Sequence, residues 1–115
     1  MTNQDRNETK KYKVAFYSGH EVTIKTRMEK GYAWLDDKGL YLDGPSNQLF
    51  ISKTEVLSAE IFKLHGTASV IRVEHRGGTL FLSVIRFLIG GQFMLVNFYG
   101  TLKLQEQLEA IAPHQ

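Results

Sequence analysis

The order of its predicted elements constrains this chain more than any other sequence feature. About eight short segments with strand-like patterns come first, and a single amphipathic segment over 102–111 follows them. Strands alternate apolar and polar residues, whereas a helix repeats its apolar positions every three or four residues. This order predicts a mainly β fold: a small antiparallel barrel or curled sheet of about seven strands, with the helix plugging one open end.

Alternation at period two is clearest in two segments of the chain. Tyr12, Val14 and Phe16 alternate with Lys11, Lys13 and Ala15, and the segment 70–76 alternates apolar residues with charged ones. Turn sequences separate the segments, among them Gly77-Gly78, which is typical of a two-residue hairpin. The other strands are expected over 22–28, 32–35, 40–42, 49–52, 79–85 and 93–98, and over 56–64, a segment that also fits a short helix.

The amphipathic segment predicts a helix over Leu102 to Ile111. Leu104, Leu108 and Ile111 fall on one helical face, and Gly100-Thr101 offers an N-terminal cap. We expect the apolar face to close the end of the sheet.

Length and composition indicate one domain over residues 11–112. The chain has 115 residues and no cysteine, which excludes disulfides, a thiolate nucleophile and cysteine-ligated metal. Residues 1–10 are polar, lack an apolar signal-peptide core and are expected to form a disordered tail. These features favour a cytoplasmic protein.

Positive charge is concentrated near the start of the chain. Residues 10–30 contain six cations and two anions, although the net charge of the whole chain is only +2, which argues against a nucleic-acid binder. If 12–17 pairs with 21–27 across a loop at 18–20, like charges face one another: Lys13 opposite Lys25, and Lys11 opposite Arg27. Such pairs are destabilising, and an anion would relieve them. The residues expected to bind an anionic lipid, ligand or protein are therefore Lys11, Lys13, Lys25, Arg27 and Lys30; the alternative is a solvated face screened by salt.

A second candidate surface lies before the last strand. If the flanking strands end near Ile85 and Phe93, then Phe87, Leu88 and Ile89 are exposed at a hairpin tip, where they would contact a protein partner or a second copy of the chain. Alternatively, the strands extend to Gly90-Gly91 and these side chains are core. The stretch 80–99 is apolar, but Arg86, the two glycines and Asn97 interrupt it, so we expect no transmembrane segment.

The sequence offers little for catalysis. The four histidines have no metal-ligand spacing, and the aspartates lie in turns, where their type is favoured by turn geometry alone. His75 shares the parity of Ile71 and Val73, which favours a half-buried side chain over a ligand. We expect no enzyme activity, no catalytic residues, no bound metal and no cofactor.

Several segments resemble the pleckstrin-homology-like superfamily, especially its small bacterial and GRAM-type members. They are 31–35 (GYAWL), 38–42 (KGLYL), 51–53 (ISK), 76–79 (RGGT) and the terminal helix. The resemblance implies a barrel capped by a helix, in a cytoplasmic or membrane-peripheral module that binds phosphoinositides or proteins. Lys13 and Lys25-Thr26-Arg27 occupy places comparable to the basic signature of the lipid-binding members.

A second resemblance concerns Arg72 and Arg76. Their Arg-x-x-x-Arg spacing is similar to the arginine motif of the PilZ domain, a small β-barrel that senses a cyclic dinucleotide. The Asp/Asn-x-Ser-x-x-Gly motif expected downstream is absent. A PilZ-like sensor is the alternative to a binding module.

Overall fold

The structure, a computed structural model, describes residues 10–20, 26–64, 68–89 and 93–112. Its elements confirm the predicted mainly β fold with a C-terminal helix. Within the described residues they are β1 (Tyr12–Ser18), β2 (Glu29–Leu35), β3 (Gly39–Asp43), β4 (Gln48–Ser52), the 3-10 turn η1 (Lys53–Glu55), β5 (Val56–Leu64), β6 (Ala68–His75), β7 (Gly78–Ile89), β8 (Phe93–Val96) and α2 (Phe98–Ile111).

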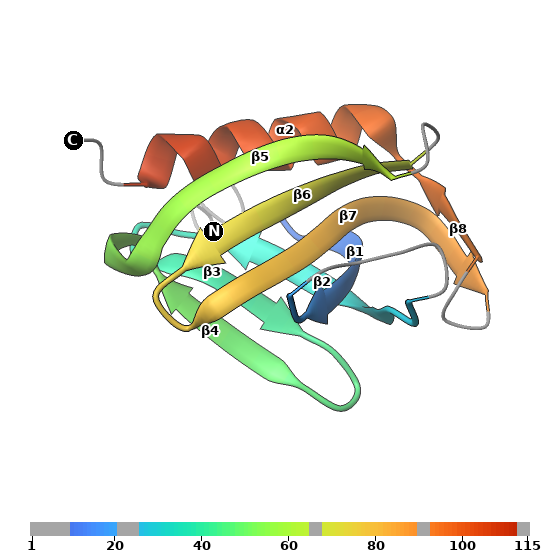
Figure 1. Cartoon of the computed structure of the whole chain (residues 1–115), viewed down its shortest axis with the longest axis horizontal. Coiled ribbons are helices and arrows are strands. Elements are labelled where there is room, and N and C mark those ends of the chain that lie inside the picture. Colours follow the sequence, from blue (N-terminus) through green and yellow to red (C-terminus); the bar gives the residue numbers. More distant parts are fainter. Residues whose placement is uncertain (1–9, 21–25, 65–67, 90–92, 113–115) are drawn as a thin grey trace, which may run out of the picture.

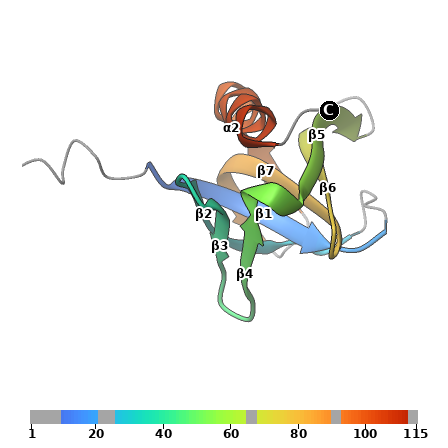
Figure 2. The ribbon, with the colours of Figure 1, turned by 90° about the vertical axis from the view of Figure 1, so that its left-hand side faces the viewer.

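The strands form one antiparallel sheet that curls strongly but does not close. Its order is β4-β3-β2-β1-β7-β6-β5, and β8 pairs with the far end of β7. The first and last strands of this order, β4 and β5, are not hydrogen-bonded to each other among the described residues. Figures 1 and 2 show the resulting open arch, with β2–β4 on one side and β5–β7 on the other.

The core lies inside the arch, and α2 covers it. Alternate residues of the strands point inward, as the period-two patterns predict. Leu104 and Leu108 of α2 are fully buried among them, and Ile111 is partly buried against the same cluster. Figure 1 shows the helix along β5 and β6. The expected role of the helix as a plug is therefore confirmed.

The helix begins four residues earlier than predicted. Its N-cap is Asn97, whose side chain accepts a hydrogen bond from the Gly100 amide, so the expected cap at Gly100-Thr101 is wrong. Thr101 instead points inward and bonds the backbone of Val84. Sequence patterning misplaced this boundary because a buried threonine and a capping threonine look alike in the sequence.

The expected pairing of the first hairpin is also wrong. β1 pairs with β2, which places Lys13 opposite Tyr32 and Phe16 opposite Glu29. Residues 26–28 are not part of a strand. Met28 buries its side chain in a second apolar cluster, on the outer side of the sheet, with Ala15, Val70, Phe81 and Ile85. The rest of the expected strand, 21–25, lies outside the described residues, as does the predicted tail except for Lys10.

The Gly77-Gly78 hairpin is present as predicted. The strands on either side of the expected Gly90-Gly91 tip extend toward it, as the alternative interpretation of the sequence expected. Gly78 adopts φ +137° at the predicted turn. β7 continues to Ile89, and Phe87, Leu88 and Ile89 pair with Leu95, Met94 and Phe93 of β8. An exposed loop beginning near Ile85 is therefore wrong, while the expected tip at Gly90-Gly91 lies outside the described residues.

Candidate functional site

A row of aromatic rings crosses the outer face of the sheet. Trp34 of β2 lies opposite Tyr41 of β3, and Tyr41 lies opposite Phe50 of β4. The Trp34 and Tyr41 rings stack with centroids 5.3 Å apart and an interplanar angle of 5°, and the Tyr41 and Phe50 centroids are 4.8 Å apart. The Lys11 ammonium group lies 4.6 Å from the Trp34 ring centroid, a cation–π contact at the start of the row.

Two further lysines and another aromatic ring lie beside this row. Lys13 is opposite Tyr32, and Lys30 is opposite Ala15, so both lysines share the outward parity of Tyr32. Tyr32 and Phe50 are each 50% exposed. We name this surface the basic–aromatic face and define it by its seven residues: Lys11, Lys13, Lys30, Tyr32, Trp34, Tyr41 and Phe50.

Alternation along four neighbouring strands places these side chains together. The intervening residues, such as Tyr12, Val14, Ala33 and Leu42, fill the core, so their neighbours point to the opposite, outer face of the sheet. Gly31 permits close packing of the strand end, since a Cβ there would lie 2.4 Å from the Asp43 carbonyl oxygen. Because alternate residues of these strands are buried in the core, the residues between them form the outer face of the sheet.

Two of the acidic residues near this face, Asp36 and Asp43, accept hydrogen bonds. The Asp36 carboxylate accepts hydrogen bonds from the Lys38 and Gly39 amides, and the first of these is the main reason that the pKa of Asp36 is lowered. Desolvation, with the Asp36 hydrogen bond and charge, raises the pKa of Tyr41. Asp43 accepts from the Gln48 side chain.

Among the residues that the structure describes, Lys11 and Lys13 contact neutral groups, the Trp34 ring and the Arg86 carbonyl oxygen. Within the described residues, the ion pairs include none of Lys11, Lys13 and Lys30. The Lys13 ammonium group donates a hydrogen bond to the Arg86 carbonyl oxygen at 3.4 Å. The face therefore presents three lysines that form no ion pair in the described part of the chain, with the Asp43 carboxylate on the same side of the sheet, opposite Tyr32.

The structure brings together three of the five predicted anion-binding residues. Lys11, Lys13 and Lys30 share the basic–aromatic face, whereas Arg27 lines a separate hollow with Phe16, Tyr17 and Glu29. Lys25 lies outside the described residues. The aromatic half of the face was missed, although the shared parity of Tyr32 and Trp34 in one strand was a usable signal.

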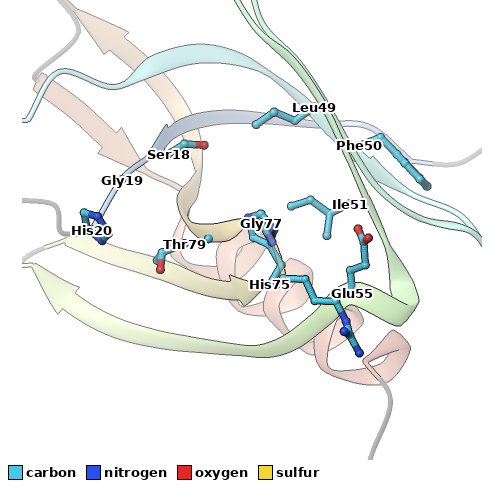
Figure 3. Close-up of a pocket in the computed structure, with 12 residues that line it drawn as sticks. Ser18, Gly19, His20, Leu49, Phe50, Ile51, Glu55, His75, Gly77 and Thr79 are labelled. Carbon is cyan, nitrogen blue, oxygen red and sulfur yellow. Dashed lines mark hydrogen bonds between the residues drawn. The ribbon is translucent and has the colours of Figure 1, made fainter.

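A cleft of about 680 Å³ opens where the sheet fails to close (Figure 3). Phe50 and Ile51 of β4 line one side, and His75 and Thr79 of the β6–β7 hairpin line the other. Desolvation lowers the pKa of His75 against the opposing charges of Glu55 and Glu74, and its Nδ1 accepts a hydrogen bond from the Gly77 amide. The half-buried histidine expected from parity is confirmed.

The cleft holds no cluster of metal-ligating side chains in the part of the chain that the structure describes. No group of three or more histidine, aspartate or glutamate side chains there could hold a metal ion. The cleft is instead lined by apolar side chains, hairpin backbone and isolated charges.

An apolar patch surrounds β8 and the start of α2. Leu95, Phe98 and Leu102 are exposed, and Phe87, opposite Leu95, is 39% exposed. Lys63 lies over the Phe98 ring, with its ammonium group 4.9 Å from the centroid. Of the three residues predicted to contact a protein, Phe87 contributes to this patch; Leu88 and Ile89 are placed here only by their backbone pairing.

Arg72 and Arg76, the pair expected for a cyclic dinucleotide, do not form a common site. Arg72 already forms ion pairs with Glu60 at 3.5 Å and with Glu74 at 3.3 Å. Arg76 lies at the hairpin turn and lines the cleft. Four residues along a strand separate their Cα atoms by roughly 13 Å.

Comparisons with known proteins do not assign a family. No protein-family model matches the chain, and no curated protein matches it significantly in sequence. The pleckstrin-homology-like and PilZ-like resemblances therefore stay predictions. None of the helices in the described residues is long and apolar enough to cross a membrane.

Proposed function

We propose that the protein is a non-enzymatic binding module that docks on an anionic membrane surface through its basic–aromatic face. The observation that carries the proposal is the coincidence of Lys11, Lys13 and Lys30 with four aromatic rings on one solvent-facing sheet surface. Tryptophan and tyrosine favour the headgroup region of membranes, and lysines are attracted to anionic lipids.

The expected energies suit reversible binding. Each lysine near an anionic membrane surface contributes about 1 kcal/mol, so three of them give about 3 kcal/mol. Half-exposed Tyr32 and Phe50 add apolar area that can leave water at the interface. The combination supports a peripheral module that binds and releases.

The fold is compatible with the resemblance that prompted a lipid-binding prediction. Antiparallel strands followed by one C-terminal helix are among the features on which the pleckstrin-homology-like resemblance rests.

Vesicle binding tests the proposal directly. The protein should co-sediment with vesicles containing phosphatidylserine or a phosphoinositide, and much less with neutral phosphatidylcholine vesicles. Trp34 is the only tryptophan in the chain, so its fluorescence reports on this face alone. We expect a blue shift of Trp34 emission with anionic vesicles.

Paired charge reversals separate a local effect from a change in net charge. Lys11→Glu with Lys13→Glu should abolish sedimentation, whereas Lys63→Glu with Lys103→Glu changes net charge equally at β5 and α2 and should largely retain it. Equal loss of sedimentation in the two double variants would show that net charge, rather than this particular face, determines vesicle binding. Sedimentation without any change in Trp34 emission would place the contact on another surface.

A further inference from the structure

The outer edge of β4 is an unprotected strand edge. β4 pairs with β3 on one side and with no described strand on the other. Natural proteins usually guard such edges with charged residues, proline or bulges. The five residues of β4, Gln-Leu-Phe-Ile-Ser, include none of these protections.

The ladder with β3 shows which backbone groups face this edge. The Gly44 amide donates to the Asn47 carbonyl oxygen, and the Lys53 amide donates to the Lys38 carbonyl oxygen. Hydrogen-bonded pairs alternate along an antiparallel ladder, so Leu49 and Ile51 direct their backbone groups to β3. Gln48, Phe50 and Ser52 therefore direct theirs outward.

We propose that a second copy of this chain pairs with β4 edge to edge, antiparallel, about a two-fold axis at Phe50. In this register Phe50 lies opposite Phe50 of the second copy, and Gln48 lies opposite Ser52. The outward backbone groups at these three positions then exchange hydrogen bonds across the axis. A symmetric, closed contact of this kind is the commonest way for identical chains to associate.

The pattern of the strand fits a copy of itself. Polar residues flank an apolar–aromatic–apolar centre, so each residue meets a partner of similar character across the axis. The Trp34–Tyr41–Phe50 row ends at this edge with Phe50 half exposed, and pairing would continue it into the row of the second copy. Aromatic cross-strand pairs stabilise sheets.

Charge also favours the antiparallel register. No charged side chain lies on β4 itself, so the two strands meet without repulsion. Lys53 follows β4 at one end, and Asp43 lies beside the other end, opposite Gln48. Antiparallel pairing brings the lysine end of each copy toward the aspartate end of the other.

The mass of the free protein in solution, measured by light scattering without lipid, tests the proposal separately from vesicle binding. We expect a concentration-dependent dimer that Phe50→Lys converts to a monomer, since it places two ammonium groups together at the axis. Leu57→Lys alters a side chain of similar exposure on β5 and should leave the dimer intact. Leu95→Lys tests the apolar patch at β8 in the same way.

Introduced cysteines test the register, because the chain has none of its own. Phe50→Cys should form a disulfide-linked dimer, since directly opposed Cα atoms in a hydrogen-bonded pair lie about 5.5 Å apart. Gln48→Cys and Ser52→Cys should cross-link only when mixed, because each lies four residues, roughly 14 Å, from its own copy.

A wild-type protein that stays monomeric at high concentration overturns the proposal, as does a dimer that Leu95→Lys dissociates and Phe50→Lys does not. Efficient self-linking of Gln48→Cys alone would contradict the register.

Discussion

Thr101 of α2 hydrogen-bonds both backbone polar groups of Val84 in β7, whose carbonyl oxygen also accepts from the Asn97 amide at 2.8 Å. Its Oγ1 accepts from the Val84 amide at 3.0 Å and lies 3.2 Å from the Val84 carbonyl oxygen, to which the hydroxyl donates. Val84 lies beyond the last pair of the β6–β7 ladder, Ile71 with Leu82. The helix thus takes over hydrogen bonds that a neighbouring strand would otherwise provide.

Thr101→Val should therefore lower the free energy of unfolding by about 1–3 kcal/mol, because it keeps the side-chain shape but leaves the buried Val84 amide without an acceptor. Urea denaturation measures the change. Thr101→Ser retains the hydroxyl and should lose much less. Similar losses in the two variants would show that the methyl group, rather than the hydrogen bonds, stabilises this contact.

Two glycines allow backbone strain to be separated from steric conflict. Gly39 and Gly78 have φ values of +155° and +137°. A Cβ at Gly39 would lie 2.2 Å from the Ile51 carbonyl oxygen, whereas a Cβ at Gly78 meets nothing within 4 Å. We expect Gly78→Ala to cost about 1–3 kcal/mol of unfolding free energy from strain alone, and Gly39→Ala to cost more. Chemical denaturation of both variants checks this order, and equal costs would contradict it.

His75 should make stability depend on pH below neutrality. Burial lowers its pKa in the folded state from the ordinary value of 6.5. The unfolded chain therefore binds a proton first as pH falls, and stability declines from about pH 6.5 until the folded pKa is reached. Denaturation midpoints between about pH 7.5 and pH 5 should show this decline.

A matched variant identifies the group responsible. His75→Asn cannot titrate but keeps a side-chain acceptor for the Gly77 amide, so it should flatten this part of the pH profile. Glu29 titrates in a different window: desolvation raises its pKa, but hydrogen bonds from Ser46 and Asn47 together lower it below 4.5. An unchanged decline in His75→Asn would assign the effect to another group.

The membrane-docking module and the PilZ-like sensor predict opposite results with cyclic dinucleotides. We expect no rise in Tm with cyclic di-GMP, because Arg72 is already paired with Glu60 and Glu74. Differential scanning fluorimetry of the wild type measures this. A rise that disappears in Arg72→Ala and in Arg76→Ala would favour the sensor over the membrane module.

Sequence patterning predicted the elements better than their partners. Tyr12, Val14 and Phe16 alternate clearly, and the strand they form is present with its inward face as expected. Its partner was misassigned because Met28 continues an apolar pattern yet packs on the outer side of the sheet. Local periodicity reports that a residue is buried, but it does not report which of two apolar clusters buries it.

The candidate site was predicted in part for the same reason. Lys11 and Lys13 were identified because their charges are visible along one strand. The contact of Lys11 with Trp34 and the position of Lys13 opposite Tyr32 depend on the register between β1 and β2, which is set by tertiary packing. The Tyr41–Phe50 contact requires two further strand registers, so no single segment of sequence contains the aromatic row.

The open join between β4 and β5 has a mechanical consequence. In a closed barrel, strand number and stagger fix the diameter, so widening the barrel would break ladder hydrogen bonds. This sheet is a split ring, and a small change in strand twist can alter the width of the cleft between Ile51 and His75 without breaking a ladder bond. The open join therefore removes the ladder constraint that would fix this width in a closed barrel.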